Sequence, residues 1–269
     1  MTLDDLLQIT NNHQAEVKEL TWHEDDVRHS FFGLYYSTLY DFYLGKSTYR
    51  LMQLIVQGDV MFTKNIIDYH PHAQRLHEIP RSAILSTGYH GDLSRNIILG
   101  TWTTFELSIS LIFDFLVNDF EYDNIVKSIN AKLVKAMSSL EENNKAVIME
   151  ILRKSSFVPL FRKMNFIIKQ NKESYGGNLI EDREFVEFVN KLRNCMVHSN
   201  GYYHGPDYNY EFNETFFEFK NKKIFSEIGE NKNVYLDISL KLKEIFMNLC
   251  NCITNVDFIP YPDDGANIA

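Results

Sequence analysis

Residues 192–201 read Leu-Arg-Asn-Cys-Met-Val-His-Ser-Asn-Gly and close a segment, beginning near Glu181, whose apolar residues recur with a helical period. At about 100° per residue, the apolar side chains share one stripe roughly 120° wide, which is typical of a core-facing helix. The stripe contains Phe185, Phe188, Val189, Leu192, Cys195 and Met196. Asn194 and His198 fall nearly opposite the stripe, and Arg193 lies on its flank. The sequence therefore predicts a helix that buries one face and presents three polar residues on the other.

The end of this helix has features that suit proton transfer. Gly201 stands where a residue with positive φ would end a helix, so His198 falls in the last turn. The carbonyl end of the helix dipole favours an imidazolium there, and Asn194 could bind one ring nitrogen and fix the tautomer. The same residues can also be explained as a structural helix end. The pattern leaves both interpretations open.

The longer string, Arg-Asn followed by three mostly apolar residues and His-Ser-Asn-Gly, resembles the signature of the HEPN superfamily. The resemblance implies a helical bundle, and many such proteins are metal-independent ribonucleases of toxin–antitoxin, CRISPR and phage-defence systems. It assigns catalysis to Arg193, Asn194 and His198. It also implies a homodimer that brings two motifs to one cleft, and an acidic residue of an early helix close to the motif. Some HEPN-like proteins keep the fold without cleaving RNA, so a non-catalytic module that binds a partner protein is the alternative.

Composition indicates a folded globular protein. The chain has 269 residues, of which 45% are apolar and 14% aromatic, enough for a substantial core. The three cysteines form no Cys-x-x-Cys pair, and the start lacks a basic, apolar signal region, so we expect a reducing cytoplasm. The net charge of −9 argues against a general duplex-binding surface. Any RNA path must be local.

Residues 92–118 predict a long apolar helix with one acidic residue on its buried face. Glu106 shares a stripe with apolar side chains, where an unpaired carboxylate would cost several kcal/mol. The stripe contains Ile98, Trp102, Phe105, Ile109 and Phe113. We expect Glu106 to pair with Arg193, or else to protrude to solvent from a less buried helix. The segment is long enough to span a bilayer, but its acidic and hydroxyl residues favour a buried bundle helix, and no membrane is expected.

Residues 153–172 form the one local cationic stretch, with six basic residues, no acidic ones and three interleaved phenylalanines. The basic residues are Arg153, Lys154, Arg162, Lys163, Lys169 and Lys172. Basic residues interleaved with aromatics can hold single-stranded RNA, so this stretch could be a phosphate track leading to Arg193. An ordinary solvated helix face with the aromatics turned inward explains the pattern equally well.

The remaining segments predict further helices and a hairpin. Helices are expected over 1–20, 21–44 and 47–69, with Gly45 as an interruption, and over 122–140 and 142–155. The aromatics of 31–49 are interpreted as core or dimer packing rather than as an RNA-stacking surface. The segment 70–92 is the best candidate boundary, and His70, His72 and His77 within it favour a polar loop over a metal site. Residues 215–219 and 224–228 predict a β-hairpin, a short strand is expected at 234–236, and a last helix at 239–256.

These patterns together predict an all-α protein: a HEPN-like antiparallel helical bundle over 92–256, with a β-hairpin insertion at about 214–236. A helical extension over 1–91 would precede the bundle, and a tail over 257–269 would follow. The favoured function is a metal-independent endoribonuclease that cleaves single-stranded RNA by attack of the 2′-hydroxyl, as a toxin or anti-phage effector. No cofactor or metal is expected. The expected partners are RNA, a second copy of the chain, and an antitoxin or another defence-system protein.

Overall fold

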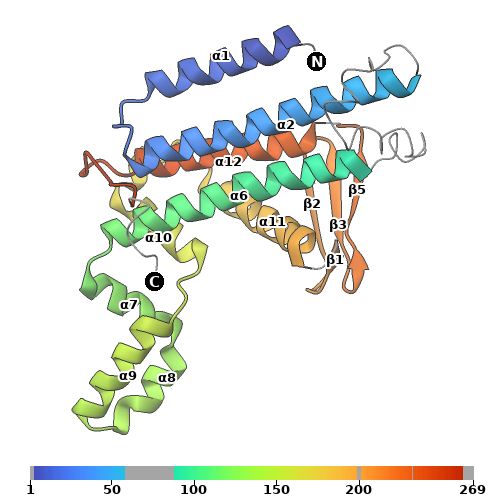
Figure 1. Ribbon diagram of the computed structural model, residues 1–269. Helices are drawn as coiled ribbons and strands as arrows, with labels where there is room; N and C mark the ends of the chain where they lie inside the picture. Colours follow the sequence, from blue (N-terminus) through green and yellow to red (C-terminus); the bar gives the residue numbers. More distant parts are fainter. Residues whose placement is uncertain (1–2, 58–87, 199–200, 232, 263–269) are drawn as a thin grey trace, which may run out of the picture. The chain divides into compact units, whose positions relative to one another are not determined.

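The computed structural model describes residues 3–57, 88–198, 201–231 and 233–262. The fold is mainly helical, in agreement with the coarser part of the all-α prediction, and it carries a small three-stranded antiparallel sheet where a hairpin was expected (Figure 1). The chain divides into two compact units, each made of several separate segments. Unit 1 comprises residues 1–21, 32–104 and 186–243, and unit 2 comprises 22–31, 105–185 and 244–269. The domain boundary predicted at residue 91 adjoins the segment 58–87, outside the described residues, and stays a prediction.

Long helices run through both units. They are α2 (Val27–Gln57), α6 (Gly88–Leu116), α11 (Leu179–His198) and α12 (Val234–Asn251). Unit 1 also contains α1 (Leu3–Glu19), which lies alongside α2 in Figure 1. The helix predicted over 1–20 is therefore confirmed, and the one predicted over 239–256 begins and ends about five residues earlier.

Gly45 does not interrupt a helix, which corrects the expected break between residues 44 and 47. Helix α2 continues through it, and a Cβ at position 45 would lie 2.3 Å from a terminal methyl of Leu93. The glycine therefore serves the close approach of two helices of unit 1. The aromatics of α2 pack as expected for a core: Phe31, Phe32, Tyr35, Tyr36 and Phe42 are buried.

The β-structure of unit 1 is larger than the predicted hairpin. Strands β2 (Tyr208–Phe212), β3 (Thr215–Phe219) and β5 (Ser226–Gly229) form an antiparallel sheet in the order β2-β3-β5, and β1 (Tyr202–Tyr203) pairs with β4 (Lys223–Ile224). The pairing of β3 with β5 confirms the two predicted arms. The strand expected at 234–236 is wrong, because α12 begins at Val234. Strands β1 and β2 lie within residues 202–213, where no strand was predicted.

The sheet covers the buried face of α11 within unit 1. The ring of Phe188 stacks on that of Tyr210 with centroids 4.4 Å apart, and the centroid of Phe217 lies 4.9 Å from that of Phe188. Phe217 and Phe219 of β3 are fully buried. Alternation along β3 thus supplies the apolar layer that the helix needs.

Residues 119–174 of unit 2 form a series of short helices (Figure 1). They are α7 (Asp119–Ile129), α8 (Ala131–Ala136), the 3-10 turn η1 (Met137–Ser139), α9 (Glu142–Ser155), α10 (Leu160–Gln170) and the 3-10 turn η2 (Lys172–Ser174). A capping box between Asn118 and Glu121 starts α7. The single helix expected over 122–140 is divided at Asn130, whose side-chain amide donates to the Oγ of Ser156 at 2.8 Å. Helix α9 has the predicted bounds.

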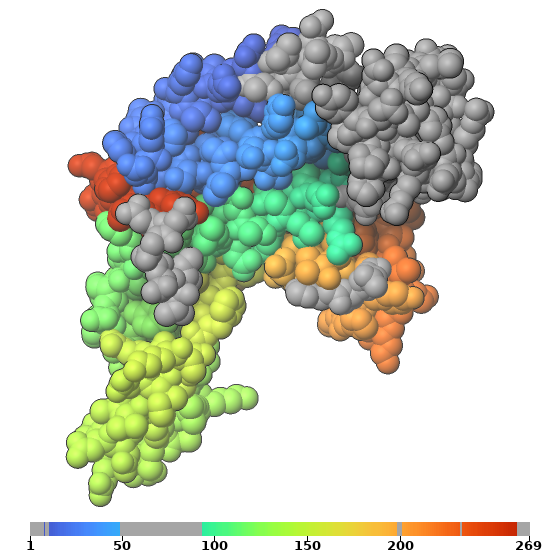
Figure 2. Space-filling model, viewed as in Figure 1, coloured from blue at the N-terminus to red at the C-terminus, as the bar shows by residue number. Residues whose placement is uncertain are grey.

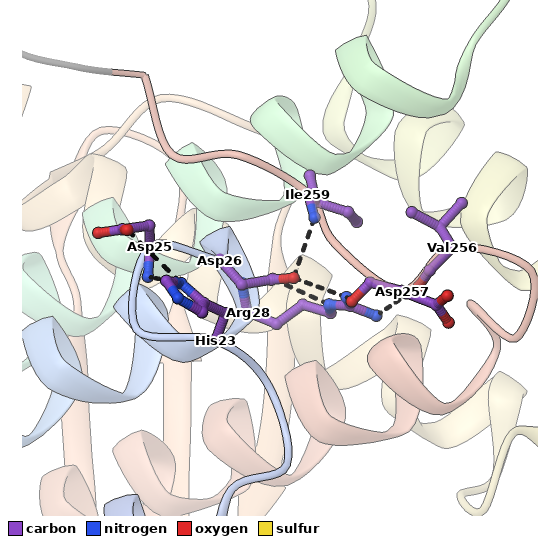
Figure 3. Close-up of polar contacts among 7 residues, drawn as sticks. All are labelled: His23, Asp25, Asp26, Arg28, Val256, Asp257 and Ile259. Atoms are coloured by element: carbon purple, nitrogen blue, oxygen red, sulfur yellow. Dashed lines mark hydrogen bonds and ion pairs between the residues drawn. The ribbon is translucent and has the colours of Figure 1, made fainter.

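Unit 2 also contains a clasp between the start of α2 and the segment after α12 (Figure 3). Arg28 and Asp26 form a buried ion pair, with Nη2 2.6 Å from Oδ2 and Nε 2.9 Å from Oδ1. Arg28 also donates to the carbonyl oxygens of Val256 and Asp257, and the amide of Ile259 donates to Asp26. The first residues of the predicted tail are therefore packed into the fold.

One helical segment of the described residues, Leu93–Leu116, has the length and composition that could cross a membrane. In its most apolar window, 56% is buried inside the protein, and Trp102, Phe105 and Phe113 are at most 1% exposed. Core helices commonly have the same length, composition and burial.

Candidate functional site

Helix α11 carries the candidate site, and its start is set by Asn178. The side-chain oxygen of Asn178 accepts hydrogen bonds from the amides of Ile180 and Glu181, at 3.1 and 3.4 Å. The helix thus begins two residues before the predicted Glu181. Its apolar stripe is confirmed: each predicted side chain is at most 8% exposed, and Val186 adds to them.

Arg193 and Asn194 lie away from that stripe, as the helical period predicted. Arg193 is half-buried and Asn194 is exposed. The Nη1 of Arg193 donates to the Oδ1 of Asn194 at 3.0 Å, and the Nδ2 of Asn194 donates to the Oδ1 of Asn190 at 3.2 Å. The carboxamide of Asn194 therefore contacts the guanidinium. The expected contact of Asn194 with His198 involves a side chain outside the described residues and stays a prediction.

Asn190 was missed at the sequence level. It precedes Asn194 by one helical turn, so the i, i+4 spacing could have indicated the contact. Because Asn190 fixes Asn194 and Asn194 contacts Arg193, the three side chains form a polar row along α11. A guanidinium held in this way loses less freedom when it binds an anion.

The helix ends at His198 and the chain turns back into the sheet of unit 1. Gly201 has φ +90°, as its position predicted. Its amide donates to the carbonyl of Cys195 at 2.8 Å, and its carbonyl accepts from the amide of Phe225 at 2.9 Å. The side chain of His198, and residues 199–200, lie outside the described residues. What the structure describes is the backbone position of His198, in the last turn, where the dipole favours a cation.

Other titratable groups of this region have structural explanations. Burial raises the pKa of the Cys195 thiol, which therefore stays protonated at neutral pH and is a poor nucleophile. Burial also raises the pKa of Tyr203. Lys191 pairs with Glu187 and lies 4.5 Å from the ring centroid of Tyr208.

Glu106 is half-buried, at the edge of the buried stripe of α6. This placement is intermediate between the two expectations, full burial and protrusion to solvent. Glu106 belongs to unit 2 and Arg193 to unit 1. Their pairing stays a prediction.

The six basic residues of 153–172 differ in their surroundings, all within unit 2. Arg153 forms ion pairs with Asp123 and Asp119, and Lys154 pairs with Glu150 at 2.9 Å. The Nζ of Lys163 donates to the Oγ of Ser110 at 2.9 Å. The other three, Arg162, Lys169 and Lys172, are exposed.

The phenylalanines of the same stretch also divide. Phe166 is buried in a core cluster with Phe113 and Val158, whereas Phe157 is 73% exposed. The ring of Phe161 lies 5.6 Å from the guanidinium carbon of Arg183. The inward-facing interpretation thus holds for Phe166, and Phe157 remains available at the surface.

Among the described ranges, no group of three or more histidine, cysteine or acidic side chains is arranged to hold a metal ion. His70, His72 and His77 lie outside those ranges. In the comparisons with known proteins, no family model, no curated protein and no solved structure matches this chain.

Proposed function

We propose that the protein is a metal-independent endoribonuclease of the HEPN type, which cleaves single-stranded RNA as a toxin or anti-phage effector. The observation that carries the proposal is the polar row on α11. Arg193 contacts Asn194 away from the buried face of the helix, about one and a half turns before the helix ends at His198. The resemblance of residues 193–201 to the HEPN signature supplies the reaction class.

RNA carries its own nucleophile, so the protein needs to supply three functions. The 2′-hydroxyl loses its proton, its oxygen forms a bond to phosphorus, and the bond from phosphorus to the 5′-oxygen breaks. The leaving oxygen takes up a proton, and the product retains a 2′,3′-cyclic phosphate. No oxidant, reductant or second substrate is required.

Arg193 stabilises the negative charge that develops on the phosphate oxygens. A guanidinium is permanently charged and its planar fork of donors fits two phosphate oxygens. Preorganised donors of this kind contribute a few kcal/mol, or about 10²- to 10³-fold in rate. The bond from Arg193 to Asn194 favours such preorganisation, which gives Asn194 a positioning role.

His198 acts as general base or general acid. Imidazole changes its charge near neutral pH, and general acid–base catalysis contributes about 10²- to 10⁴-fold. The position of His198 in the last turn of α11 favours the protonated form, which suits protonation of the leaving 5′-oxygen.

We propose that the RNA strand follows Arg162, Lys169 and Lys172 rather than all six basic residues. These three are exposed, whereas the charges of Arg153 and Lys154 are partly compensated by acidic neighbours. Phe157, with 73% of its surface exposed, offers a face on which a base can stack.

We further propose that two copies of the chain associate about a two-fold axis and bring two α11 ends to one cleft. This proposal follows from the resemblance and from the outward direction of the polar row. Light scattering at tens of micromolar should show a dimer. A monomer with intact ribonuclease activity would contradict it.

The experiment that tests the function is cleavage of a labelled single-stranded RNA by the full-length protein in excess EDTA. Arg193→Ala and His198→Ala should each lower the rate by at least about 10²-fold. The matched controls are Arg183→Ala on the same helix and His204→Ala just beyond it, both exposed, and both should cleave as the parent does. Equal activity of all four variants would exclude the α11 end as the active site. Absence of any cleavage would favour the non-catalytic interaction module.

A further inference from the structure

Helices α1 and α2 of unit 1 border an open surface pocket, referred to below as the hollow, with a volume of about 410 Å³. Figure 2 shows these two helices in blue, side by side on the surface. The hollow is lined by His13, Gln14, Val17, Lys18, Gly33, Tyr36, Ser37 and Tyr40. Small-molecule sites commonly measure about 300–1,000 Å³ and are mostly apolar with a few polar groups. Its size and lining match that class.

Gly33 is the feature that packing does not explain. It lies inside the 31-residue helix α2, where glycine is less favourable than alanine, yet a Cβ built on it would meet nothing within 4 Å. Other helical glycines of unit 1 differ: a Cβ at Gly45 would lie 2.3 Å from Leu93, and one at Gly100 would lie 2.6 Å from Thr38. Close helix contacts therefore account for Gly45 and Gly100. Gly33 is exposed and lines the hollow, and the absent side chain leaves open space beside it.

The walls of this space are aromatic. The ring of His13 stacks on that of Tyr36, with centroids 4.4 Å apart and planes 20° apart. Tyr40, one turn along α2, is 42% exposed. Burial lowers the pKa of His13, so its imidazole is neutral at neutral pH and behaves as a flat, weakly polar surface. Flat faces of this kind favour a planar ring as the occupant.

The charges beside the hollow favour an anion. Lys18 is the one charged side chain of the lining, and it is exposed. The nearby carboxylate of Glu16 accepts a hydrogen bond from the hydroxyl of Tyr36 and pairs with the Nζ of Lys243 at 3.1 Å. The negative charge of Glu16 is therefore compensated by Lys243, and Lys18 is the charged group that the lining itself offers to a ligand.

We propose that the hollow between α1 and α2 binds a small planar aromatic anion. Its ring lies over Gly33 against Tyr36, Tyr40 and His13, and its anionic group pairs with Lys18. A nucleoside monophosphate and an aromatic carboxylate share this chemistry. The site is independent of the proposed ribonuclease activity, because none of its residues lies on α11.

The first test measures binding to the full-length protein by isothermal titration calorimetry. The probes are adenosine 5′-monophosphate and 1-naphthoate, each compared with its uncharged counterpart, adenosine and 1-naphthalenemethanol. At least one anion should bind saturably, about tenfold tighter than its counterpart. Binding of the nucleotide alone would identify a nucleotide as the ligand, and binding of naphthoate alone would identify a carboxylate. Failure of both anions to bind would overturn the proposal.

The second test fills the hollow without unfolding the helix. Gly33→Leu should weaken binding by at least about tenfold, and its melting temperature should be equal or higher, because leucine is the better helix former. Thr48→Leu, an exposed substitution on the same helix, is the matched control and should bind normally. Lys18→Gln should weaken binding of the anion but not of its uncharged counterpart. A folded Gly33→Leu variant that binds as tightly as the parent would overturn the proposal.

Arg193→Ala separates this site from the proposed active site. Adenosine 5′-monophosphate could also bind at Arg193, but that binding would be lost in Arg193→Ala and retained in Gly33→Leu. The hollow requires the reverse result. The inference and the proposed function can therefore fail separately.

Discussion

Arg28 lies at the start of helix α2, and Arg193 lies near the end of helix α11. The two arginines differ in burial and in the groups that accept their hydrogen bonds. Arg28, at the start of α2, is 2% exposed, and its guanidinium donates to Asp26 and to two backbone carbonyls. Arg193, in the last two turns of α11, is half-buried and donates to the exposed side chain of Asn194. Burial with every bond supplied from the backbone and one carboxylate indicates a structural arginine. A half-buried guanidinium that donates to an exposed carboxamide is placed where it can also bind a ligand.

The largest effect is expected from Arg28→Ala, which leaves the carboxylate of Asp26 buried without its partner. Removing one member of a buried ion pair typically costs about 3–5 kcal/mol. Chemical denaturation should show a loss of that size. Arg28→Lys keeps the charge but loses the bidentate contact with Asp26, so its loss of unfolding free energy should be smaller than that of Arg28→Ala. If Arg28→Ala unfolds at the same denaturant concentration as the parent, the clasp is not structural.

Glu106→Ala should have the next largest effect, because a half-buried partner would be left with part of its hydrogen bonding unsatisfied. A cost of about 1–3 kcal/mol is expected, and Glu106→Gln should be milder. A double-mutant cycle with Arg193→Gln measures the predicted pair directly. A coupling energy of about 0.5–3 kcal/mol would support the pair, and additive effects would exclude it.

A smaller, pH-dependent effect is expected at the clasp. Burial alone would raise the pKa of Asp26, but hydrogen bonds from Arg28 and from the amide of Ile259 outweigh it and hold that pKa below its ordinary value. The folded carboxyl therefore binds its proton less readily than the unfolded one. Its contribution to stability is complete above the unfolded pKa of about 3.9 and is lost as pH falls through the lower, folded value.

The measurement is the difference in unfolding free energy between the parent and Asp26→Asn, followed from pH 6 downward. This difference should be constant down to about pH 4 and should shrink below it. A difference that does not change with pH would show that Asp26 is not stabilised as a carboxylate.

Arg193→Ala should destabilise the protein less than Arg28→Ala, because Arg193 is half-buried whereas Arg28 is 2% exposed. Its cost should be about 1–3 kcal/mol, as for Glu106→Ala, if the two residues form the predicted pair. The comparison of the two arginines depends on this contrast. If Arg193→Ala destabilises the protein as much as Arg28→Ala, Arg193 is also structural, and any loss of activity would then report unfolding.

The parts of the fold that the sequence predicted are those with one clear physical signal. The apolar stripe of α11 and the positive φ of Gly201 were predicted because a helical period and a glycine after the last turn act locally. The strands β1 and β2 were not predicted. Tyr208 to Phe212 does alternate aromatic and polar residues, which is a strand signal that was overlooked, whereas β1 has only two residues and is defined by its pairing with β4. The helix break predicted at Gly45 was wrong because this glycine is explained by its close contact with Leu93, a residue distant in sequence.

The sequence placed the candidate residues on the helix but did not predict their contacts. The helical period placed Arg193 and Asn194 off the buried face. It did not show that Asn194 binds Arg193, because that bond depends on side-chain rotamers. The basic stretch shows the same limit: the ion pairs of Arg153 with Asp119 and Asp123 join α9 to α7, and spacing within 153–172 contains no information on them.

The most direct test of the central claim uses an RNA in which one nucleotide, at the mapped scissile position, carries hydrogen instead of the 2′-hydroxyl. The account predicts that the full-length protein in excess EDTA cleaves the unmodified RNA, leaves a 2′,3′-cyclic phosphate, and does not cleave at the modified position. Cleavage at the 2′-deoxy position would contradict the account, because the nucleophile would then come from elsewhere and the α11 end would not be acting on the 2′-hydroxyl.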